Sequence, residues 1–268
     1  MKSTLFVTAG VAALGLAPAS AADFAARPYG KAPPPAYVTP LPSWAGFYLG
    51  ANGGADWSRN CWTLNRVNGV PVVPTQSEGC HNATSGLIGG QIGYRWQAAS
   101  WVFGLEAQGN WTDLKSSNAS SAAFAAGITN NTKTDAIGLF TGQIGYAWGN
   151  VLWYVKGGAA VAHNKYTGTA NAAAPVAVGT LLDSASETRW GGTVGTGVEF
   201  GFAPNWSVAV EYDHLFMGSR DITFPATAIV NARVDTIKQD IDMATVRVNY
   251  RFGGPAARVE FRRLGQKP

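Results

Sequence analysis

The clearest pattern in the chain is an alternation of apolar and polar residues over residues 193–214. Apolar side chains recur at every second position in two arms, and a short turn at residues 203–205 separates the arms. A period of two indicates β-strands, because successive side chains of a strand point to opposite faces. The segment therefore predicts a β-hairpin with one apolar face, and its other face carries Glu199 and Glu211.

The same alternation recurs along the chain and predicts eight strands. They cover residues 44–57, 86–96, 101–111, 134–148, 151–162, 188–202, 206–216 and 241–252. The connections alternate between short turns and long polar segments. The short ones are 97–100, 149–150 and 203–205, and the long ones, which we expect to be loops, are 58–84, 113–133, 163–187 and 217–240. Outer-membrane barrels have this asymmetry, with short periplasmic turns and long outer loops.

Tryptophan positions distinguish a membrane barrel from a soluble β-sandwich, which would also alternate along its strands. Five tryptophans cluster beside the short turns, as in the aromatic girdle of a membrane barrel, namely Trp96, Trp101, Trp148, Trp153 and Trp206. No apolar run approaches the roughly 18–20 residues of a membrane-spanning helix. We therefore predict an all-β fold, an eight-stranded antiparallel transmembrane β-barrel.

The remaining segments predict export. Residues 1–21 read as a signal peptide, with Lys2, an apolar stretch and a small-residue cleavage site at 19–21. Residues 22–43 form an Ala- and Pro-rich periplasmic lead-in, residues 44–252 the barrel, and residues 253–268 a C-terminal tail. An even strand number places both termini in the periplasm and the long loops outside the cell. We therefore expect the protein to lie in the outer membrane.

Charged residues make up only 13% of the chain, and the basic ones are scattered rather than clustered, so we expect no nucleic-acid partner. By alternation, seven charged side chains should face the lumen: Glu106, Lys156, Arg189, Glu199, Glu211, Arg247 and Arg251. An eight-stranded barrel is just wide enough for side chains to fill its interior. We interpret the seven as an ionic network that plugs the lumen; the alternative is a narrow, charge-selective channel.

The two cysteines, Cys61 and Cys80, both fall in the first long polar segment. An exported chain reaches an oxidising compartment, which favours a disulfide between them. Two free thiols are the alternative. A zinc site is less favoured, because His81 beside the two cysteines leaves tetrahedral zinc short of a fourth protein ligand.

The three histidines do not indicate an enzyme active site. His81 and His163 fall in different predicted loops, and Asp213 and His214 are strand neighbours that point to opposite faces. We predict no enzyme, cofactor or metal site, and the two loop histidines give only weak support for haem or small-ligand capture. Basic residues of the predicted loops are candidates for lipopolysaccharide phosphates or for ordinary solvated charges: Arg59, Arg66, Lys115, Lys133, Lys165, Arg220 and Lys238.

Several motifs in order resemble one family. They are WAGFYLGANGG at 44–54, GGQIGYRW at 89–96, GQIGYAW at 142–148, WYVKGGAA at 153–160 and VRVNYRF at 246–252. Together with the Pro-rich lead-in they are similar to the small outer-membrane β-barrel proteins of alphaproteobacteria, called outer-membrane immunogenic or porin-like surface proteins. Two features depart from that pattern: Gln143 stands where the family has Arg, and a tail follows Phe252.

The resemblance implies a non-enzymatic surface protein with a role in envelope integrity. It implies contact with outer-membrane lipid and lipopolysaccharide, and partners such as peptidoglycan or a host surface. A small porin-like diffusion channel is the alternative function.

Overall fold

The computed structural model describes residues 43–172 and 176–252. The chain divides into two units, residues 1–39 and 40–268, and every described residue belongs to the second. The predicted signal peptide, nearly all of the lead-in, and the tail lie outside the described residues. No helix within the described part is long and apolar enough to cross a membrane.

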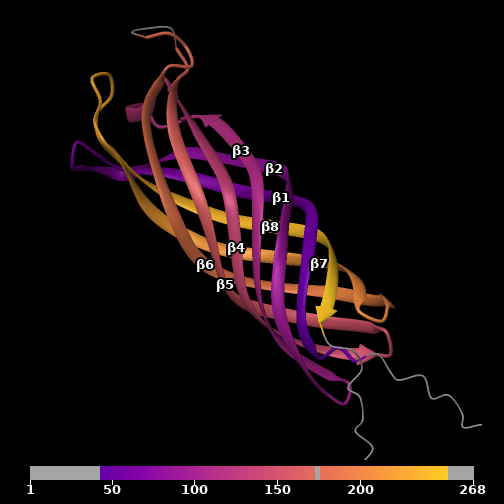
Figure 1. Cartoon of the computed structure of the whole chain (residues 1–268). Helices are drawn as coiled ribbons and strands as arrows, with labels where there is room; N and C mark the ends of the chain where they lie inside the picture. The colour runs from indigo at the N-terminus through magenta and orange to yellow at the C-terminus, as the bar shows by residue number, and fades with distance from the viewer. Residues whose placement is uncertain (1–42, 173–175, 253–268) are drawn as a thin grey trace, which may run out of the picture. The chain divides into compact units, whose positions relative to one another are not determined.

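Eight strands and one short 3₁₀ helix make up the described chain (Figure 1). The strands are β1 (Gly46–Val67), β2 (Val70–Ala98), β3 (Trp101–Ala119), β4 (Ile128–Trp148), β5 (Val151–Ala170), β6 (Leu181–Ala203), β7 (Trp206–Phe224) and β8 (Arg233–Phe252). The 3₁₀ helix, η1 (Ala123–Ala125), lies between β3 and β4. The predicted strand count is confirmed.

Each strand pairs antiparallel with its sequence neighbours, and β1 pairs with β8 to close the barrel. The closing register runs from Phe47 opposite Phe252 to Val67 opposite Arg233. A closed ring leaves no strand edge with unpaired backbone groups, which is the condition for crossing a lipid bilayer with strands. The fold class predicted from the alternation is confirmed.

Side-chain exposure in the hairpin of β6 and β7 follows the predicted faces. Val198 and Val210 are 49% and 63% exposed, whereas Glu199 and Glu211 are each 1% exposed. Apolar side chains therefore cover the outside of the wall and charged ones line the inside. This inverted distribution is favourable in lipid and unfavourable in water, because it would leave a large apolar surface exposed to solvent.

The four segments predicted as long loops are largely strand, so that prediction is wrong. β1 and β2 continue past the predicted loop boundaries to a two-residue turn at Asn68-Gly69, where both φ angles are positive. Asn-Gly is the preferred pair for such a turn. Figure 1 shows the strands extending as long ribbons toward this end of the barrel. Outside the membrane both faces of a strand can be polar, so the alternation fades although the backbone pairing continues.

Candidate functional site

The centre of the lumen holds an ionic cluster from four strands, here called the central cluster: Glu106 (β3), Lys156 (β5), Glu211 (β7) and Arg247 (β8). Lys156 Nζ lies 2.6 Å from Glu211 Oε1 and 3.4 Å from Glu106 Oε1. Arg247 Nη2 lies 2.7 Å from Glu106 Oε2, and its Nη1 contacts Glu211. Because all four side chains are at most 1% exposed, these ion pairs join opposite walls without intervening bulk water.

A third carboxylate borders the central cluster. Asp213 Oδ1 lies 3.3 Å from Lys156 Nζ, so three carboxylates face two cations among the described residues at this level. Two tyrosines supply further hydrogen bonds: Tyr48 donates to Glu106 Oε2 and Tyr154 donates to Glu211 Oε2, each at 2.6 Å. Buried charges require such pairing, since an unpaired one is costly in a low dielectric.

Two glycines make room for these tyrosines. A Cβ at Gly93 would lie 2.5 Å from the Tyr48 ring, and a Cβ at Gly197 would lie 2.6 Å from the Tyr154 ring. Any larger residue at either position would push the tyrosine out of place. Glycine on the inner face thus serves close packing, as expected for a strand glycine opposite a bulky neighbour.

A second ion pair lies nearer the short turns. Arg95 Nη2 lies 2.8 Å from Glu199 Oε2, and Asn249 donates to Glu199 Oε1 at 3.1 Å. Gln143, the departure from the family pattern, accepts from Arg95 at 3.4 Å and donates to the Tyr48 hydroxyl at 3.0 Å. Sequence reasoning missed Arg95, although its position between the outward Tyr94 and Trp96 places it on the inner face.

Two residues of the predicted lumen network, Arg189 and Arg251, have other partners and do not join the central cluster, so the prediction of a single network is corrected. Arg189 pairs with Glu187 at 2.6 Å and donates to the Ile237 carbonyl at 3.0 Å, away from the central cluster. Arg251 lies at the short-turn end, where it donates to the Pro204 carbonyl at 3.0 Å. Alternation assigns a face to a residue but gives no height along the barrel, which is why the seven could not be separated.

Apolar layers lie on both sides of the charged levels. Toward the short turns, Trp44, Val102, Ala147, Leu152 and Tyr154 form one buried cluster. On the other side lies a larger one, made of Leu87, Ile137, Leu139, Ala160, Ala162, Leu215, Met217, Ile241 and Met243. Buried side chains therefore occupy the lumen at several successive heights along the barrel.

Beyond these layers an outer ionic cluster surrounds Arg233. Its guanidinium lies 2.9 Å from Asp183, 3.1 Å from Asp235 and 3.2 Å from Glu78. Burial raises the pKa of Asp235 to about 8, and Arg233 opposes that rise. Glu78 reaches the lumen because the register shifts between β1 and β2 at Gly79, where φ is +105°. Such a bulge re-aims a side chain, and no alternation pattern predicts it.

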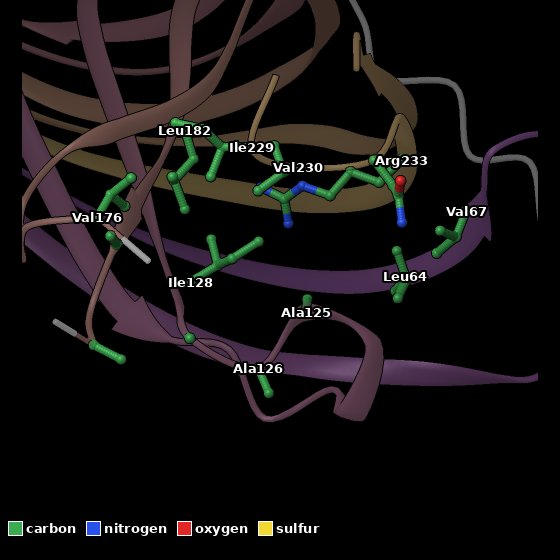
Figure 2. Close-up of a pocket in the computed structure, with 14 residues that line it drawn as sticks. Leu64, Val67, Ala125, Ala126, Ile128, Val176, Leu182, Ile229, Val230 and Arg233 are labelled. Atoms are coloured by element: carbon green, nitrogen blue, oxygen red, sulfur yellow. The ribbon is translucent and has the colours of Figure 1, made fainter. Parts of the chain in front are cut away.

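The outer mouth of the barrel contains a cavity of about 260 Å³ (Figure 2). In Figure 2 the Arg233 side chain crosses the cavity, with Ile128, Leu182, Ile229 and Val230 around it. The remaining lining is mostly small and aliphatic. This volume lies just below the range of roughly 300–1,000 Å³ typical of small-molecule pockets.

Cys61 and Cys80 are direct cross-strand partners in β1 and β2, with their Sγ atoms 2.03 Å apart in a disulfide. Cys80 is exposed, and both residues lie on the outer side of the wall beyond Trp57. The bridge therefore joins two paired strands and does not close a floppy loop.

The five tryptophans at the short turns all point outward and are 45–57% exposed. Trp101 packs edge-on against Tyr146, and Trp206 against Tyr250, so neighbouring strands share aromatic contacts. Trp57, Trp111 and Trp190 lie outward at the other end of the apolar band. The membrane-spanning part of the wall is the part between these two aromatic levels.

The histidines do not share a site. His81 is buried inside, bonded to Asn118 and Thr132, whereas His163 lies on the outer face. Both lie on strands, so their placement in loops is wrong. His214 Nδ1 lies 2.6 Å from Asp242 Oδ1 on the outer face, pointing away from the buried Asp213. In the described ranges, no group of three or more His, Cys, Asp or Glu side chains is arranged to hold a metal.

Comparison with known proteins agrees with this architecture. The model of the outer membrane protein beta-barrel domain family matches residues 8–252. The 31 kDa outer-membrane immunogenic protein of Brucella melitensis is 29% identical over 262 residues, covering 94% of this chain and all of that protein. The 25 kDa outer-membrane immunogenic protein of Brucella abortus is 27% identical over 255 residues, covering 94% of this chain and 99% of that protein.

Among solved structures, the outer membrane protein OprG of Pseudomonas aeruginosa is similar with a TM-score of 0.44 and 12% identity. The match covers 78% of this chain and 97% of that one. The family model spans the whole described barrel, and the Brucella relatives span nearly the whole chain. The chain therefore belongs to the outer-membrane β-barrel protein family, among relatives of the immunogenic proteins of alphaproteobacteria.

Proposed function

We propose that this protein is a non-enzymatic, non-conducting structural protein of the outer membrane that displays an extended barrel at the cell surface. The single observation that carries the proposal is the filled lumen. Two buried ionic levels and the apolar layers on both sides of them occupy the described interior from the short turns to the outer mouth. A diffusion channel requires a continuous water-filled path, which this packing leaves no room for.

The proposed orientation follows the two ends of the barrel. Three tight turns lie at the end that carries both ends of the described chain, and the long hairpins project from the other. In outer-membrane barrels the short turns are periplasmic. The disulfide and the mouth cavity would then face the outside, where the barrel could contact lipopolysaccharide or a host surface. The short-turn end of the barrel would then face the peptidoglycan.

Solute efflux tests the proposal. Purified protein is refolded into liposomes loaded with a small sugar, with a 16-stranded porin as positive control, and folding is verified by the gel shift between unheated and boiled samples. We expect sugar retention equal to protein-free liposomes. Efflux that rises with the amount of folded protein would support the diffusion channel and refute the sealed lumen.

A second candidate, capture of a small apolar ligand, is favoured by the mouth cavity. Its lining combines aliphatic side chains with the Arg233 guanidinium, and it contains neither His81 nor His163, the two candidate haem ligands. The test is binding of a fluorescent naphthalene probe to the protein and to Ala125→Trp, in which the new side chain fills the cavity. Equal probe fluorescence from both proteins would refute this candidate.

A further inference from the structure

The closed ring of backbone pairing covers the membrane-spanning wall, but between β6 and β7 it ends near the outer aromatic level. The register of these two strands runs only as far as Gly192 opposite Phe216. Beyond that level, residues 181–191 of β6 pair with β5 and residues 218–224 of β7 pair with β8. Within the described ranges, no backbone bond joins the two segments to each other. They therefore border an open gap in the wall, here called the β6–β7 seam.

Backbone groups of alternate β6 residues face this seam. Gly201 N donates to the Asn150 carbonyl at 2.8 Å, so the odd-numbered residues of β6 bond to β5, and the register continues without a shift as far as Asp183. In an antiparallel strand, the backbone groups of successive residues point to opposite sides. The even-numbered residues, whose N–H and C=O groups therefore point into the seam, are Ser184, Ser186 and Thr188.

A second seam, between β2 and β3, is protected where this one is not. The pairing of β2 with β3 also ends near the outer aromatic level. There, Asn118 Nδ2 and Ser121 N both donate to the Glu78 carbonyl, at 2.7 and 3.3 Å. Residues 183–188 of β6, in contrast, contain no proline, lysine or register shift, which are the usual devices that prevent pairing at an edge. The β6 edge can therefore pair with a further strand.

The mouth cavity lies at the outer end of the β6–β7 seam. Its lining includes Leu182 from β6 and Ile229 and Val230 from the β7–β8 connection, the elements on the two sides of the seam (Figure 2). A strand added to β6 would alternate its side chains between the two faces of the wall, and those on the inner face could enter this cavity. Recognition by strand addition combines these two features, backbone bonds at an edge and a pocket for alternate side chains.

The charges beside the cavity favour a basic side chain over an acidic one. Glu78, Asp183 and Asp235 surround the single guanidinium of Arg233. Even with a proton on Asp235, two carboxylates face one cation. The buried Asp235 oxygens receive no hydrogen bond of good geometry within the described residues. A lysine or arginine of an incoming strand would supply both a donor and the missing positive charge.

We propose that the β6–β7 seam binds an extended peptide segment of a partner protein. The segment pairs with residues 183–188 of β6 as an added strand, places an aliphatic side chain in the mouth cavity and places a basic one beside the outer ionic cluster. The β7 edge of a second copy does not meet these requirements, because its Ile222 and Phe224 side chains are buried in their own barrel. The inference deepens the proposed surface role and rests on its orientation, with the long hairpins outside, but not on whether the lumen conducts.

Peptide selection on the folded full chain in detergent tests the proposal. The probe is a display library of peptides of about ten residues, the upper range of a β-strand. The test variant is Ser186→Pro, which removes an N–H that faces the seam and takes part in no bond to β5. The matched control is Ser117→Pro: Ser120 N donates to the Ile128 carbonyl, so the N–H of Ser117, another exposed serine, faces the protected seam. Ala125→Trp fills the mouth cavity, and the heat-dependent gel shift verifies that each protein is folded.

We expect the enriched peptides to alternate aliphatic and polar residues and to include a basic one. Their affinity should fall about tenfold, or about 1.4 kcal/mol, for Ser186→Pro, because an edge hydrogen bond is lost and its neighbours are disturbed. N-methylation of one alternate set of peptide residues should weaken binding similarly and that of the other set should not, since only one set faces β6. Ala125→Trp should also weaken binding, whereas Ser117→Pro should bind like wild type.

The absence of any enriched peptide, equal binding by Ser186→Pro and wild type, or an equal loss in both proline variants would overturn the proposal. So would a wild-type dimer in native mass spectrometry that Ser186→Pro converts to monomer, because the edge would then serve a second copy. Detergent exposes both ends of the barrel, so this assay does not depend on orientation. Labelled peptide that binds the purified protein but not intact cells would contradict the orientation alone.

Discussion

Replacing Arg247 with methionine removes the cation that bridges Glu106 and Glu211. Arg247 is fully buried, and without it three carboxylates would face Lys156 alone in the described part of the central cluster. Removing one partner of a buried ion pair typically costs about 3–5 kcal/mol, because the remaining charge is left without compensation. We expect a loss of that size in the free energy of unfolding.

The measurement is equilibrium unfolding in urea of the protein in lipid vesicles, followed by tryptophan fluorescence. Lys238→Met is the control, since that side chain is 63% exposed and lies 3.8 Å from Asp240; it should cost no more than about 1 kcal/mol. Arg247→Met combined with Glu106→Gln restores the original charge difference and should recover at least half of the loss. If Arg247→Met cost no more than Lys238→Met, the central cluster would not contribute to stability.

Three further predictions concern the outer cluster, the disulfide and the lipid face. Burial raises the pKa of Asp235 to about 8, so the folded protein holds a proton that the unfolded chain releases above about pH 4. The free energy of unfolding should therefore fall as the pH rises from about 4 to 8. Asp235→Asn should flatten this dependence in urea titrations. A membrane-impermeant maleimide should label Cys61 and Cys80 on intact cells only after reduction, and quantitative labelling without reductant would rule out the disulfide. Val210→Arg places a charge on the lipid face and should cost about 2–4 kcal/mol in refolding titrations near the bilayer midplane; an unchanged stability would mean that this face does not contact lipid.

The sequence was sufficient to predict the membrane-spanning wall of the barrel, because contact with lipid imposes a strict alternation on the residues of that wall. Every outward residue between the aromatic levels must be compatible with hydrocarbon. A period of two was therefore enough to predict that Val198 and Val210 face outward and that Glu199 and Glu211 face inward. The same requirement ends at the membrane surface. The strands beyond Trp57 carry polar residues on both faces, so the pattern predicted loops where the backbone continues to pair.

The contacts between side chains inside the lumen could not be predicted from the sequence, for a different reason. Arg95 and Glu199 are 104 residues apart in the chain, and only the registers of the intervening strands bring them to the same height. Glu78 enters the lumen through a bulge at Gly79, which changes the face of one residue without a recognisable pattern. Local alternation predicts which face each side chain points to. Which side chains meet inside the lumen depends on the stagger between neighbouring strands, added up around the whole barrel.

Single-channel recording of the refolded protein in a planar lipid bilayer tests the sealed lumen most directly. The same preparation must show the heat-dependent gel shift, so that silence cannot come from unfolded protein. The filled interior predicts a flat current at applied voltages of either sign. Stable, reproducible conductance steps in folded wild-type protein would contradict it and establish a continuous path through the barrel.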